Sequence, residues 1–174
     1  MFKFIITCLS LLFLSSTVYA LEKDKTYILF AIDSDDYIEE LNISGEASFT
    51  VEKLNTDTLI KFYLLEASAG DYYFSSLKTG IGKARLNDDF SWDFDVVKSK
   101  VNYVGHMEVN LEYIGTLHAG YSRVELANKS SFAIEYLKSN HSELFDKKNL
   151  VYQGPGKDDF IDFYLANYFK SDEE

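Results

Sequence analysis

The sequence predicts a mainly β fold, an antiparallel β-sandwich of about seven strands followed by two C-terminal α-helices. Three observations support this fold class. Short segments alternate apolar and polar residues with a period of two. Turn-forming Gly, Asn and Asp residues separate these segments. After Asn128 the apolar residues recur at helical spacing instead.

The alternating segments identify the expected strands. In residues 90–97, for example, Phe90, Trp92, Phe94 and Val96 point to one side and polar residues to the other. One dry and one wet face is typical of antiparallel sheets. Residues 59–66 are apolar on both faces, which suits a central strand covered on both sides. The expected strands are 26–32, 47–51, 59–66, 71–74, 90–97, 107–113 and 123–128.

Two helices are expected at the C-terminal end, at about 131–145 and 159–169. Ser130 or Ser131 can cap the first helix. Asp158 or Asp159 can start the second, where acidic charge meets the positive end of the helix dipole. About 45 residues rarely sustain a core alone. We therefore expect the helices to pack on the sandwich within a single domain, residues 21–174.

Residues 1–20 have the pattern of a secretory signal peptide. Lys3 precedes a short apolar run, and small residues lead to an expected cleavage between Ala20 and Leu21. The run is shorter than the ~20 residues of a spanning helix. Periplasmic or secreted location, with no membrane span after cleavage, follows as an expectation. An uncleaved N-terminal anchor is the alternative.

The sole cysteine, Cys8, lies inside that apolar run. Cleavage would therefore leave a cysteine-free mature chain, without disulfides. Whether Cys8 is lipidated stays open. The formal net charge is −11, so the chain is acidic. Nucleic-acid binding needs clustered Lys and Arg, so nucleic acid is excluded as a partner.

Two stretches resemble known protein families. Residues 65–74 (LEASAGDYYF) resemble a turn and strand of transthyretin-like and carboxypeptidase-regulatory-like sandwiches. Residues 94–109 resemble a pattern of small bacterial envelope proteins of unknown function, many of them lipoproteins. Ser99 stands where that family usually has glycine, and Cys8 lacks a convincing lipid-attachment motif. The resemblance implies an Ig-like or transthyretin-like sandwich in the cell envelope and no known activity.

Four residues are expected to shape the fold and not to form a functional site. Gly70 can take a positive φ and reverse the chain. Tyr72 or Tyr73 can then enter the core while its hydroxyl reaches a backbone group, as in tyrosine corners. Gly105 can form a bulge or a close backbone approach.

A metal site is a hypothesis for two groups of residues. His106 and His118 flank the expected hairpin at 107–115, so both can approach one carboxylate. Asp33 and Asp35 lie in an acidic segment that could offer oxygen ligands to Ca²⁺. The alternatives are ordinary turn or surface histidines and a solvated acidic loop.

The favoured function is a non-enzymatic binding or structural module of the envelope, with an unknown envelope protein or a glycan as partner. No catalytic constellation and no cofactor motif is found in the sequence. A carbohydrate-binding module is one rival, because 16% of the residues are aromatic. The other is a metal-dependent hydrolase that uses His106 and His118.

Overall fold

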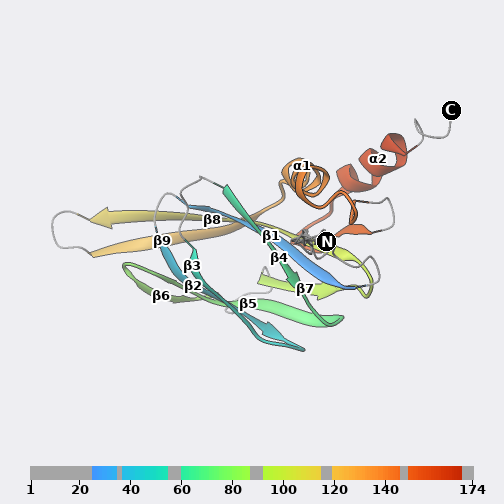
Figure 1. The fold of residues 1–174 in the computed structure, drawn as a ribbon. Coiled ribbons are helices and arrows are strands. Elements are labelled where there is room, and N and C mark those ends of the chain that lie inside the picture. Colours follow the sequence, from blue (N-terminus) through green and yellow to red (C-terminus); the bar gives the residue numbers. More distant parts are fainter. Residues whose placement is uncertain are drawn as a thin grey trace, which may run out of the picture.

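The computed structural model describes residues 25–34, 37–54, 60–86, 92–114, 119–145 and 149–169. Two β-sheets face each other, and two C-terminal helices lie on the outer side of one of them (Figure 1). The predicted fold class, a mainly β sandwich with two C-terminal helices, is confirmed. The signal peptide and its cleavage site at Ala20 and Leu21 lie outside the described residues, as does Cys8.

Each sheet has five strands. Sheet A contains β1 (Tyr27–Ser34), β4 (Ile60–Glu66), β8 (Val101–Ile114), β9 (Ala119–Ala127) and β10 (Leu150–Tyr152). Sheet B contains β2 (Ile38–Gly45), β3 (Phe49–Leu54), β5 (Gly70–Thr79), β6 (Gly82–Arg85) and β7 (Asp93–Val96). All pairings in sheet B are antiparallel, whereas β8 pairs in parallel with β1 and with β10.

The main core lies between the two sheets and is rich in aromatic rings. Phe30 of β1 contacts Phe74 of β5 edge to face, with ring centroids 5.6 Å apart. Phe74 in turn packs on Phe94 of β7 at 5.2 Å. Such pairs add about 0.5–1.5 kcal/mol to the free energy of burial. The alternating aromatic residues of the sequence therefore hold the sheets together.

The sequence predicts a central strand at residues 59–66, and this prediction is wrong. The strand β4 ends the strand order of sheet A and pairs with β1. Its two faces are nevertheless both covered, because Tyr63 packs in the core between the sheets and Phe62 in a second core under the helices. Apolar residues on both faces of a strand thus indicate that other elements cover both faces. They do not indicate that the strand lies in the centre of the sheet.

The second core lies between sheet A and the helices α1 (Ser130–Asn140) and α2 (Asp159–Tyr168). The first helix is shorter than the predicted 131–145, and His141 caps its C-terminus. Asn, His and Ser are weak helix formers, and they occupy positions 140–142. Leu144 follows in a turn and still reaches the second core.

The caps of the two helices differ from each other. Lys129 is the N-cap of α1, and its side chain makes no capping hydrogen bond, so the expected cap at Ser130 or Ser131 is wrong. Asp158 caps α2 and accepts hydrogen bonds from the backbone N–H groups of Phe160 and Ile161. An aspartate at this position satisfies helix N–H groups that otherwise lack partners.

Candidate functional site

Two β-bulges shape the outer face of sheet B, the face turned away from sheet A. In β2 the register shifts between Ile38 and Glu40, which leaves Glu39 as an extra residue. In β5 Ser75 is the extra residue, because Asn42 pairs with Ser76 and the next residue of β2 pairs with Phe74. A bulge places two consecutive residues on one side of a strand, and bulges are common beside functional sites.

The bulge in β5 brings both Ser75 and Ser76 to the outer face. The core residues Phe74 and Leu77 flank them in the chain. Ser75 Oγ donates a hydrogen bond to the backbone oxygen of Asn42 at 3.2 Å and accepts one from Ser44 Oγ at 3.0 Å. The two serines are thus fixed in place by the neighbouring strand β2.

A row of polar side chains crosses the sheet at Ser76. The register aligns Thr50, Asn42, Ser76 and Arg85 on four successive strands, β3, β2, β5 and β6. Thr50 Oγ1 donates to Asn42 Oδ1 at 2.8 Å, and Asn42 Nδ2 donates to Ser76 Oγ at 3.0 Å. Ser76 therefore accepts from the protein, and its own hydroxyl proton can be donated to a ligand.

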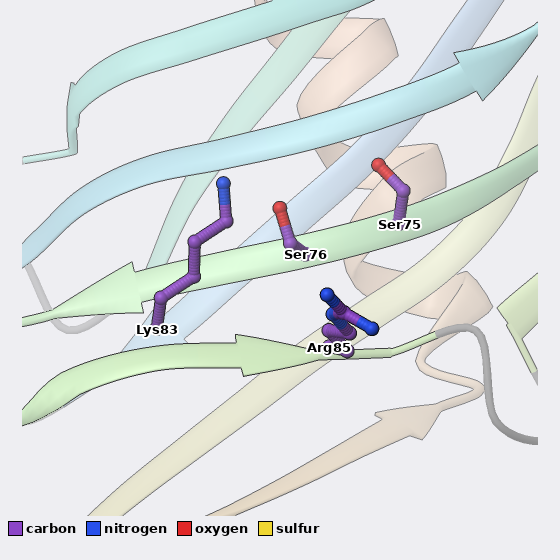
Figure 2. A pocket seen from close by; sticks show the side chains of 4 residues that line it. All are labelled: Ser75, Ser76, Lys83 and Arg85. Atoms are coloured by element: carbon purple, nitrogen blue, oxygen red, sulfur yellow. The ribbon is translucent and has the colours of Figure 1, made fainter.

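Ser75, Ser76, Lys83 and Arg85 line a hollow of about 580 Å³ on this face (Figure 2). Figure 2 shows the two serines on β5 and the two cationic side chains on the adjacent strand β6. Alternation along β6 explains the pair, because Lys83 and Arg85 are exposed while Leu86 is buried. The volume falls in the range of small-ligand sites.

The charge of the hollow is opposite to that of the whole chain. Lys83 Nζ lies 3.6 Å from Glu40 Oε1, and Arg85 forms no ion pair with any described residue. Asn42 Nδ2 donates to Glu40 Oε1 at 2.5 Å. That hydrogen bond, with the charges of Lys83 and Lys78, lowers the pKa of Glu40 below its ordinary value of 4.5. Arg85 is thus the cation whose charge is left for a ligand.

The two sequence-based metal candidates that the structure describes, His106 and Asp33, occupy another part of the molecule. His106 and Asp33 lie on sheet A, while His118 and Asp35 lie outside the described residues. His106 has 0% exposure. Its Nδ1 lies 2.7 Å from the Tyr103 hydroxyl, which accepts the backbone N–H of Lys129 at 3.0 Å. Burial lowers the pKa of His106 from 6.5 to about 4.

Asp33 is bound by a cationic side chain. Asp33 of β1 lies opposite Glu108 of β8, and Lys129 Nζ contacts both carboxylates, at 3.2 and 2.7 Å. These ion pairs raise the pKa of Lys129. Within the part of the chain that the structure describes, no three His, Cys, Asp or Glu side chains are grouped so that they could hold a metal ion. The site with His118 stays a hypothesis.

The four residues that are expected to shape the fold lie in the sandwich. Gly70 starts β5 with φ +143°. Tyr72 is buried and donates its hydroxyl hydrogen bond to the backbone oxygen of Ser68 at 3.1 Å, while Tyr73 is only half-buried. Gly105 has φ +119°, and the pairing of β8 with β1 shifts its register there. All four serve the framework and none lines the hollow.

The sequence analysis does not predict that the residues lining the hollow form a site. Alternation predicted strand 71–74 and ended before Ser75, since two consecutive serines break a period of two. The signal was present nonetheless. Pairs of adjacent polar residues inside a strand, Ser75–Ser76 and Glu39–Glu40, mark bulges that turn both side chains outward.

Comparison with models of protein families, with curated proteins and with solved structures finds no match to this chain. The likeness to envelope sandwiches therefore stays a prediction. Neither described helix has the length and apolar character that crossing a bilayer requires.

Proposed function

We propose that the protein is an exported, non-enzymatic β-sandwich that binds a ligand through an anionic group on the outer face of sheet B. Export, to the periplasm or beyond the cell, is supported by the signal-peptide pattern of residues 1–20. The anion site is supported by one observation above all. The cationic hollow of Lys83, Arg85 and two serines lies on a chain with a net charge of −11.

The chemistry of the hollow suits a carboxylate, sulfate or phosphate group. The guanidinium of Arg85 presents a planar fork of N–H donors that matches two oxygens of such a group. Lys83 adds a second positive charge, and Ser76 adds a hydroxyl donor whose oxygen Asn42 already holds. A neutral ligand would gain no electrostatic attraction from the two cationic side chains. The net charge of −11 disfavours non-specific binding of anions to the rest of the chain.

Isothermal titration calorimetry with sulfate and with glucuronate tests this site. We expect weak binding, with a Kd of about 1 mM at low salt, because one small group makes few contacts. Arg85→Ala should weaken binding about tenfold or more, since a hydrogen bond to a charged group contributes about 1.5–3 kcal/mol. Arg123→Ala is the matched control, because Arg123 is an exposed arginine of β9 that pairs with Glu125 instead.

Equal affinity in wild type and the Arg85 variant would contradict the proposed site. An equal loss of affinity in Arg85→Ala and Arg123→Ala would also contradict the site. Both variants remove one positive charge, so equal losses would reflect only the change in net charge.

A further inference from the structure

The anion site forms one half of a longer polar surface on sheet B. A second hollow, of about 290 Å³, is lined by Tyr37, Glu39, Glu40, Glu52, Lys53 and Lys78. The two hollows adjoin at Glu40. Its carboxylate lines the second hollow and lies 3.6 Å from Nζ of Lys83, which lines the first. A single ligand can therefore contact both.

The strand register gives the surface its dimensions. Glu52, Glu40, Lys78 and Lys83 form a second row across β3, β2, β5 and β6. This row runs beside the row that ends at Arg85. Three spacings between strands of about 4.8 Å make each row ~14 Å long, and the two rows are separated by ~7 Å. The surface is too long for one small anion and about the reach of a trisaccharide.

The charges along this surface are divided between its two halves. The strands β2 and β3 contribute all the carboxylates together with Lys53, and β5 and β6 contribute only cations. Glu40 and Glu52 lie directly opposite each other, an arrangement that destabilises a sheet. Lys78 and Lys83 contact Glu39 and Glu40, whereas no ion pair with a described residue holds Glu52. The acidic half thus offers hydrogen-bond acceptors for ligand hydroxyl groups.

We infer that the ligand is an anionic oligosaccharide, a short sugar chain that carries a carboxylate or a sulfate; the inference rests on the proposed anion site. The charged group binds at Lys83 and Arg85. Ring hydroxyls donate to Glu52 and accept from Lys78. Tyr37, a residue that is 42% exposed, offers the flat apolar surface of its ring, against which a sugar ring packs at the other end.

Other ligand classes fit this surface less well. A stable protein interface usually has a buried core with several aromatic or other large apolar side chains. Of the large exposed apolar side chains that the structure describes, Tyr37 alone lines either hollow. A nucleic acid would place phosphates beside Glu39, Glu40 and Glu52, which repel them. A polyhydroxylated chain with few charges uses both halves.

Calorimetry with a length series provides the test. The probes are galacturonic acid and its trimer, a sulfated monosaccharide and a sulfated trisaccharide, and neutral maltotriose. We expect at least one anionic trimer to bind about tenfold tighter than its monomer, and maltotriose to bind far more weakly. Tyr37→Ala and Glu52→Gln should weaken trimer binding several-fold and leave monomer binding unchanged. Arg85→Ala should weaken both.

Matched controls separate this surface from the other exposed aromatic residues and carboxylates. Phe163→Ala removes an aromatic ring of α2 that is 69% exposed, and Glu135→Gln removes a carboxylate of α1. Neither should change trimer binding. A loss in Phe163→Ala that is absent in Tyr37→Ala would overturn the inference, because the sugar would then bind at the helices.

The test distinguishes failure of the inference from failure of the anion site. If the monomers bind through Arg85 but neither trimer binds more tightly, the oligosaccharide is wrong and the anion site stands. The same conclusion follows if Tyr37→Ala and Glu52→Gln leave trimer affinity unchanged. If neither the monomers nor the trimers bind, or if Arg85→Ala changes nothing, both proposals are wrong. Glu52→Gln should fold at least as stably as wild type, because it removes one of two opposed like charges.

Discussion

Replacement of His106 by leucine should change how the stability of the fold depends on pH. The imidazole is fully buried, and the rings of Phe62 and Phe132 lie edge-on to it, with centroids 5.1 and 5.9 Å away. The Tyr103 hydroxyl accepts the Lys129 N–H and therefore donates its own proton to Nδ1. This assignment places the ring proton on Nε2, which has no hydrogen-bond partner. The folded protein thus holds His106 neutral.

The size of the effect follows from the pKa of His106. Burial, with a smaller contribution from the charge of Lys129, lowers this pKa from 6.5 to about 4, while Asp33 and Glu108 oppose the shift. Between pH 6.5 and 4 the unfolded chain binds a proton that the folded chain does not. The free energy of unfolding therefore falls as the pH falls through this window. At about 1.4 kcal/mol per pH unit, the loss reaches about 3 kcal/mol near pH 4.

Urea unfolding of wild type and His106→Leu, at a series of pH values from 7.5 to 4, measures this loss. The carboxylates titrate in both proteins, so the difference between the two curves isolates His106. We expect wild type to lose about 3 kcal/mol more than the variant across the window. Parallel curves would refute the reasoning. So would a wild type that gains stability relative to the variant as the pH falls.

Two further substitutions test the backbone. Ser99 has φ +56°, which costs an L-residue about 1–2 kcal/mol, so Ser99→Gly should stabilise by about 0.5 kcal/mol after the entropic cost of glycine. Ser99→Ala should not raise the free energy of unfolding in chemical denaturation. A rise equal to that of Ser99→Gly would show that backbone strain at this position is not the cause. Gly45→Ala would place a Cβ 2.1 Å from the backbone oxygen of Asp71 and should cost more than about 2 kcal/mol. Gly80→Ala places a Cβ with no atom within 4 Å and serves as the control. Equal losses of stability in the two variants, measured by thermal unfolding, would refute the clash at Gly45.

Periodicity predicted the strands whose two faces differ. Each of the seven predicted strand segments corresponds to a strand, whereas β2, β6 and β10 are not predicted from the sequence. The bulge at Glu39 breaks the alternation of β2, and β6 and β10 are only 4 and 3 residues long. Local pattern reports which faces are covered. It does not report which strands are neighbours, so β4 was misplaced.

The candidate site was harder to predict because it depends on register. Nothing local in the sequence shows that Arg85 will lie opposite Ser76, or that Asn42 will hold Ser76 from the other side. Residue type alone instead points to the isolated histidines, because histidine is a common metal ligand. The sequence predicts that His106 is a metal ligand or an ordinary turn or surface residue, but its position beside Gly105 in β8 buries it completely. Its aromatic surroundings come from β4 and α1, distant in sequence.

A nitrogen-15 NMR titration of the protein with glucuronate tests the central claim most directly, because it locates binding residue by residue. We expect the largest shift changes at the amides of Ser75, Ser76, Lys83 and Arg85, with loss of these changes in Arg85→Ala. Changes that cluster on α1 and α2, or that persist unaltered in the variant, would contradict an anion site on the outer face of sheet B.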